Sequence, residues 1–197
     1  QAILPLRGKI LNVASASSDK MSGNQELNDM ILALGCGTRG QYDDKALRYE
    51  RVVIMTDADV DGAHIAALLM TYFYREMPNL ISNGHLYLAQ PPLYRLTQGA
   101  KSAYARDDAH RDELLKDDFK GKSKVEISRF KGLGEMPAVQ LRETTMDPRK
   151  RTLLKVTIPS GDEIATARQV EDLMGRKPET RFAFIREHAG FVSDLDI

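Results

Sequence analysis

The chain has a single cysteine, carries no net charge and contains no apolar run long enough to cross a membrane. One cysteine, Cys36, excludes an internal disulfide framework and indicates a reducing compartment. Basic and acidic side chains number 28 each, so nucleic-acid binding would require a local basic face. Because no signal peptide and no membrane-spanning run are present, we expect a cytoplasmic protein that does not bind membranes.

An initiator methionine is also missing from the amino terminus. The chain begins QAILPLRGKILNV, with apolar residues from the start, and we expect it to be a piece of a longer protein. Its 197 residues are 42% hydrophobic and 28% charged, which is typical of a globular protein with one large or two small domains.

The most informative stretch is RVVIMTDADVDGAHI, residues 51–65. The apolar run at residues 52–55 predicts a strand covered on both faces, as in a parallel sheet. Three carboxylates, Asp57, Asp59 and Asp61, follow at alternate positions, and a long helical pattern comes next. Since ligands of open α/β sheets gather at the carboxyl ends of strands, these carboxylates are candidates for a binding site.

Three neighbouring carboxylates repel one another unless a cation or water relieves them. Mg2+ suits such a cluster, because it takes one or two carboxylates and completes its shell with water and phosphate oxygens. A calcium loop of the EF-hand type is excluded, because Leu68 stands where that loop needs a glutamate. The remaining alternative is a polar turn in which an aspartate only caps the next helix.

Two further stretches are candidates for phosphate binding. Arg7 and Lys9 flank Gly8, and Lys131 opens the sequence KGLGE before a predicted helix. Glycines before a helix amino terminus favour anion binding, although each motif alone is more often a surface turn. His64, at the start of the helix after the carboxylates, could reach a phosphate or a metal-bound water.

Hydrophobic periodicity predicts the remaining elements. A helix ends at Gly35, with Leu27, Ile31 and Leu34 on one face and an amino-terminal cap at Ser22. The other predicted elements are a helix with Ile65, Leu68, Leu69, Tyr72 and Phe73 as core, a strand at 85–89, a hairpin at 93–105, a helix at 107–119, a strand at 152–158, and helices at 162–174 and 178–192.

The motifs PLRGKILN, TDADVDGAHI and RFKGLGEM, followed by LRETTMDP, resemble the B subunits of bacterial type II DNA topoisomerases. The resemblance extends to the tail LMGRKPETRFAFIREHA and so covers essentially the whole chain. Within this family, the segment YARDDAHRDELL and the lack of a large insertion before Lys124 favour the topoisomerase IV branch, with the equivalent region of DNA gyrase as the alternative.

The resemblance implies an α/β fold. Residues 1–95 would form a Rossmann-like Toprim domain, its amino-terminal part missing, with a parallel sheet covered by helices. Residues 96–197 would form the family's α+β carboxyl-terminal tail region. In the family, a further metal-ligand glutamate lies upstream, in a Glu-Gly-Asp-Ser motif. The family's ATPase domain also lies upstream, so the full-length protein would bind ATP and this piece would not.

The family's functional residues can be transferred to matching positions. Asp57, Asp59 and Arg7 would be catalytic, and Asp57, Asp59 and Asp61 would bind Mg2+. Glu26 lies in a segment similar to the family's quinolone-contacting region. The residues expected to contact DNA are Lys9, Asn12, His64, Lys131 and Arg142.

By resemblance, the chain is a fragment of a DNA-cleavage core that acts in the nucleoid. It would support double-strand cleavage, religation and strand passage, and hence relaxation and decatenation, with an A subunit in an A2B2 heterotetramer. The A subunit supplies the catalytic tyrosine, so none of the seven tyrosines here is assigned that role and the isolated fragment is expected to be inactive.

An alternative hypothesis, of a different functional class, is a non-catalytic module for DNA binding or subunit docking. A different Toprim enzyme, such as a primase or nuclease, is disfavoured by RFKGLGEM and the tail.

Overall fold

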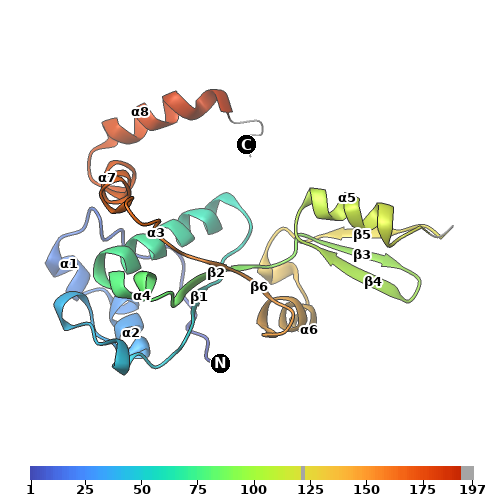
Figure 1. The fold of residues 1–197 in the computed structure, drawn as a ribbon, viewed down its shortest axis with the longest axis horizontal. Coiled ribbons are helices and arrows are strands. Elements are labelled where there is room, and N and C mark those ends of the chain that lie inside the picture. The colour runs from blue at the N-terminus through green and yellow to red at the C-terminus, as the bar shows by residue number, and fades with distance from the viewer. Residues whose placement is uncertain (121–122, 192–197) are drawn as a thin grey trace. The chain divides into compact units, whose positions relative to one another are not determined.

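A computed structural model describes residues 1–120 and 123–191, and its mixture of helices and strands confirms the α/β fold class (Figure 1). The strands form two sheets, with the orders β1-β2-β6 and β4-β3-β5. The strands are β1 (Val52–Ile54), β2 (Leu86–Gln90), β3 (Tyr94–Gln98), β4 (Lys101–Ala105), β5 (Glu126–Arg129) and β6 (Thr152–Lys155). The α-helices are α1 (Ser18–Ser22), α2 (Gln25–Leu34), α3 (Val60–Glu76), α4 (Pro78–Ser82), α5 (Asp108–Asp117), α6 (Ala138–Leu141), α7 (Glu163–Met174) and α8 (Pro178–His188).

The chain divides into two compact units. The first unit comprises Gln1–Val52, His64–Leu86 and Lys155–Ile197, and the second comprises Val53–Ala63 and Tyr87–Leu154. The predicted division of the sequence into domains at residues 1–95 and 96–197 stays a prediction. Across the described residues, every helix is too short or too polar to span a bilayer.

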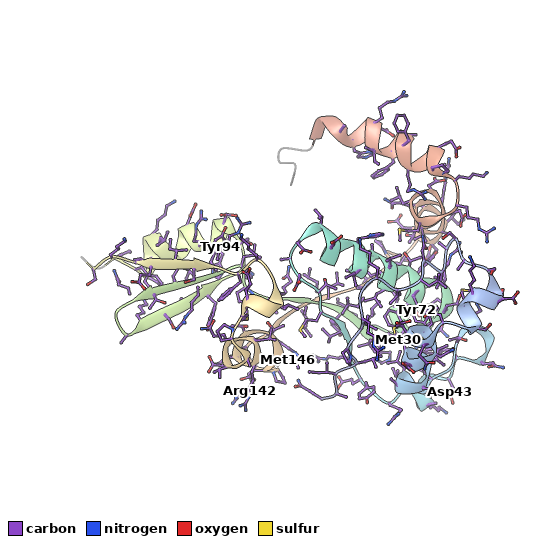
Figure 2. All side chains as sticks on the ribbon, turned by 180° about the vertical axis from the view of Figure 1, so that it is seen from behind. Met30, Asp43, Tyr72, Tyr94, Arg142 and Met146 are labelled. Atoms are coloured by element: carbon purple, nitrogen blue, oxygen red, sulfur yellow. The ribbon has the colours of Figure 1, made fainter. Side chains whose placement is uncertain are left out.

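The helices α2 and α3 contribute much of the core of the first unit, together with α4 and the amino-terminal segment. On α3, Leu68, Leu69, Tyr72 and Phe73 are buried as the helical periodicity predicts, and the rings of Tyr72 and Phe73 meet edge to face. On α2, Leu27 and Leu34 are buried as predicted, whereas Met30 is buried and Ile31 is only half-buried (Figure 2).

The two ends of α2 differ in how well the sequence predicts them. Gly35 ends the helix as expected, with a left-handed φ of 74° and its N–H donating to the carbonyl of Ile31. The predicted cap at Ser22 is wrong. Asn24 caps the helix instead, accepting a hydrogen bond from the Leu27 N–H, and the Ser22 hydroxyl donates to the Asp19 carbonyl.

An ion pair stabilises the carboxyl end of α3. Arg39 donates from Nε and Nη2 to the two carboxylate oxygens of Glu76, at 2.7 and 2.6 Å. The Glu76 side chain is only 11% exposed, so the guanidinium replaces most of the water that the carboxylate has lost. These hydrogen bonds raise the pKa of Arg39.

We expect Arg39→Ala to lower the free energy of unfolding by about 1.5–3 kcal/mol, because it leaves the Glu76 carboxylate poorly hydrated and without its charged donor. Urea unfolding of the chain measures this change. Arg168→Ala is the matched control, since Arg168 is 86% exposed and pairs with Asp172 on the same helix at 3.7 Å. Its loss should stay within about 0.5 kcal/mol, and equal losses in the two variants would contradict the prediction.

In the second unit, β3 pairs antiparallel with both β4 and β5, and α5 lies along this sheet (Figure 1). The hairpin turns at Gly99, whose φ is 60°, within the predicted range 93–105. Tyr94, Leu96, Ala105 and Phe119 form the core between sheet and helix, and the Tyr94 hydroxyl donates to Asp108 at 2.9 Å. The predicted hairpin is therefore confirmed, and Tyr94 and Leu96, two residues apart on β3, share its buried face.

Candidate functional site

Asp57 and Asp59 lie in the connection between β1 and α3, Asp61 lies in the first turn of α3, and all three residues are exposed. Asp59 Oδ1 accepts a hydrogen bond of 2.7 Å from the Gly62 N–H, so Asp59 caps the helix that follows. The capping role that the sequence left open therefore belongs to Asp59. An exposed cap retains the second carboxylate oxygen for other ligands.

This turn is tight because Gly62 has no side chain. A Cβ atom at Gly62 would clash with the carbonyl oxygen of Asp57 and lie 2.8 Å from its carbonyl carbon. The start of α3 therefore packs directly on the backbone of Asp57. The position of the Asp57 backbone, and with it that of its carboxylate, depends on glycine at residue 62.

The KGLGE loop holds the Asp57 side chain. Leu133 N–H donates to Asp57 Oδ1 at 2.7 Å, and a Cβ atom on Gly132 would lie 3.0 Å from the carboxylate carbon. The Lys131 N–H donates to Glu135 Oε2 at 2.9 Å. The loop thus uses its amides as an anion site, as its glycines suggest, but the anions are carboxylates of the chain itself. A contact between residues 76 positions apart leaves no signal in a single sequence.

The three carboxylates do not form a cluster that would by itself enclose a metal ion. Within residues 1–120 and 123–191, no group of three or more histidine, cysteine or acidic side chains is placed to hold a metal. Asp57 and Asp59 each use Oδ1 for a backbone hydrogen bond and remain exposed. Mg2+ needs only one or two carboxylates, whereas Ca2+ takes about six to eight oxygen ligands. The donors therefore suit Mg2+ better than Ca2+.

Four predicted site residues lie in the first unit around its amino-terminal segment or on α3. Arg7 and Lys9 are exposed in an irregular stretch around Gly8, which has a φ of 126°. The Asn12 side chain donates to the Met174 carbonyl at 2.8 Å and accepts from the Ala14 N–H at 3.0 Å. His64 is exposed on α3 and lines a pocket with Asn12.

The other predicted residues are spread over both units. Lys131 is exposed in the KGLGE loop, and Arg142 is exposed where a π-helical turn, Arg142–Met146, follows α6 (Figure 2). Both belong to the second unit. Glu26 is half-buried in the first turn of α2, in the first unit. DNA contact by Lys131 and Arg142 and drug contact by Glu26 stay predictions.

Two arginines of this pocket were not predicted from the sequence. Arg176 and Arg181, from the turn between α7 and α8 and from α8, line the same pocket as Asn12 and His64. The tail GRKPETR shows basic residues, but nothing in its spacing indicates which part of the chain they face.

Comparison with known proteins finds two families. Residues 1–91 match the Toprim domain, and residues 122–186 match the DNA gyrase B subunit, carboxyl terminus. The chain is 66% identical over 197 residues to the B subunit of DNA topoisomerase 4 from Bartonella bacilliformis and 66% identical over 198 residues to that from Caulobacter vibrioides. It is 50% identical over 201 residues to the B subunit of DNA gyrase from Spiroplasma citri. Each match covers the whole chain but only 28%, 28% and 30% of these relatives.

Proposed function

We propose that this chain, which belongs to the family of bacterial type II topoisomerase B subunits, forms part of the DNA-cleavage core of such an enzyme. The family resemblance noted in the sequence is thereby confirmed. An identity of 66% to the B subunits of two topoisomerase 4 relatives, against 50% to the gyrase relative, supports the topoisomerase IV branch. Relaxation and decatenation without supercoiling by the full-length enzyme would test that assignment.

The observation that carries the proposal is the fixed position of Asp57. Its backbone is packed against Gly62 and its carboxylate is held by the Leu133 N–H, yet the residue remains exposed. A carboxylate that is oriented before its ligand arrives loses little freedom on binding. We therefore propose that Asp57 and Asp59 would hold Mg2+, with Asp61, the third acid in the sequence, as the remaining predicted ligand.

A Mg2+ ion held there would stabilise the negative charge that develops on the cleaved phosphate and on the leaving 3′ oxygen. Arg7 would add a positive charge near the cleaved phosphate. Lys9, Asn12, His64, Lys131 and Arg142 are proposed to contact the DNA. Glu26 is proposed to lie at the quinolone-contacting surface.

The nucleophile is proposed to come from an A subunit, in an A2B2 assembly. Two tyrosines of this chain are poorly suited to the role, because burial raises the pKa of the Tyr72 phenol, and burial together with Asp44 raises that of Tyr42. A phenol that ionises reluctantly is a weak nucleophile. The ATP used for strand passage would be bound by parts of the protein outside this chain.

The proposal is tested by strand cleavage of supercoiled DNA with the full-length B subunit and its A subunit. We expect cleavage with Mg2+ and at least about a hundredfold less after chelation, the scale on which removal of a charge-stabilising group acts. The isolated chain should not cleave DNA. Cleavage by the isolated chain without an A subunit, or cleavage that is indifferent to chelation, would contradict the proposal.

A further inference from the structure

The first unit contains a basic pocket of about 350 Å3 between the α7–α8 connection, the amino-terminal segment and α3. It brings together three parts of the chain that are far apart in sequence. The residues that line it are Asn12, Ser15, His64, Leu173–Arg176 and Arg181.

Direct hydrogen bonds join two of these parts. The Asn12 side chain donates to the Met174 carbonyl at 2.8 Å, and Arg176 Nε donates to the Ser15 carbonyl at 2.7 Å. These two hydrogen bonds therefore hold the turn after α7 against residues 12–15. Arg176 uses Nε for this bond, so its two terminal nitrogens remain available to a ligand.

The second arginine is positioned by the end of α7. Arg181 Nη1 donates to the carbonyls of Gly175, at 2.5 Å, and Leu173, at 3.4 Å. These carbonyls lie at the carboxyl terminus of α7, where a cation is favoured by the helix dipole. The guanidinium is therefore held in one orientation at the pocket, and its other nitrogen donors are not used by these two bonds.

The ionisable side chains that line the pocket are all basic. Among the described residues, the lining contains two guanidinium groups and one imidazole and no carboxylate, and the nearby Glu171 carboxylate, next to Gly175, is paired with Arg75 at 2.6 Å. In the part of the chain that the structure describes, Arg176 and Arg181 form no ion pair, whereas Arg39 and Arg75 of the same unit pair with Glu76 and Glu171. Guanidinium groups bind phosphate through paired N–H donors, so two of them in one pocket suit a phosphate group.

We propose that this pocket binds a phosphodiester group of DNA, with Arg176 and Arg181 as the main ligands and His64 beside them. The inference rests on the proposed function, because it assumes that the chain contacts DNA. It extends the DNA contact from the amino-terminal segment to the α7–α8 connection. A free phosphate ion has the same chemistry as the proposed ligand, and the experiment separates the two.

The test measures duplex DNA binding by the complete enzyme, assembled from full-length B and A subunits, without Mg2+ and over a range of salt concentrations. Arg176→Gln keeps an N–H donor for Ser15 but removes the charge. We expect about three- to tenfold weaker binding and a salt slope smaller by about 0.9 for each pocket that contacts DNA. Arg186→Gln, an equal charge change at an exposed position of α8 outside the pocket, should change neither the affinity nor the slope.

A role of Arg176 in folding alone would lower the unfolding temperature of the protein without changing the salt slope, and that result would overturn the proposal. Equal DNA binding by Arg176→Gln and Arg186→Gln would also overturn it. So would a titration in which Arg176→Gln abolishes binding of inorganic phosphate but leaves DNA affinity and slope unchanged. If the wild-type enzyme itself fails to bind duplex DNA, the proposed function fails, and this inference fails with it.

Discussion

Asp57→Asn in the full-length B subunit is expected to lower Mg2+-dependent DNA cleavage by at least about a hundredfold, while assembly with the A subunit and thermal stability stay unchanged. Asparagine is nearly isosteric with aspartate and keeps the oxygen that accepts from the Leu133 N–H at 2.7 Å. The substitution therefore removes the charge and retains the local hydrogen bond, which separates metal binding from structure.

Asp59→Asn is expected to behave in the same way. Asparagine caps helices about as well as aspartate, so the bond to the Gly62 N–H should persist. Asp117→Asn is the matched control, because Asp117 is an exposed residue of α5 in the second unit, away from the proposed site. Cleavage assays on the three reconstituted enzymes, with unfolding temperatures measured alongside, give the comparison.

The same variants decide whether the carboxylates bind a metal or only stabilise the turn. If both Asp57→Asn and Asp59→Asn cleave DNA like the control, the residues serve only the turn, and a non-catalytic binding or docking module is the better description. The bond from Asp59 to the helix start is compatible with either reading, because an exposed cap can still bind an ion. The effect on cleavage of removing the charge, while the local hydrogen bond is kept, therefore decides between the two hypotheses.

Local patterns predicted much of the fold. The hairpin at β3 and β4, the buried face of α3 and the end of α2 at Gly35 all follow from periodicity or from a glycine at a turn. Each of these signals is contained in about ten neighbouring residues. The cap of α2 was misplaced because Ser22 and Asn24 are both good capping residues, and short-range sequence does not decide between them.

The contacts that support the proposed site could not be predicted from the sequence. The carboxylates and the glycine-rich loop could be found separately, yet the bond from Leu133 to Asp57 depends on where the loop lies in the folded chain. The same holds for Arg176, whose partner is a backbone carbonyl at Ser15 and therefore has no side-chain signature. Family resemblance suggests roles for the residues, which stay proposals, and the structure shows what holds Asp57 in place.

A graded series of glycine substitutions should measure how strongly the turn fixes Asp57. Gly62→Ala is expected to have the largest effect, because the added methyl group meets the backbone of Asp57, which cannot move without shifting the start of α3. We expect it to lower the free energy of unfolding by about 2–4 kcal/mol. In the full-length enzyme, it should also reduce cleavage about as severely as Asp57→Asn.

Gly132→Ala should have an intermediate effect, since its methyl group would lie 3.0–3.2 Å from the Asp57 carboxylate, a side-chain group that can turn by a few tenths of an ångström. Gly134→Ala, in the same loop, has no atom within 4 Å of the added carbon and serves as the control. Urea unfolding of the chain and cleavage by the full-length enzyme should rank the three variants in the same order. Loss of cleavage in Gly132→Ala at nearly wild-type stability would indicate that the orientation of one carboxylate limits the reaction. Wild-type behaviour of Gly62→Ala in both measurements would mean that the turn does not hold Asp57.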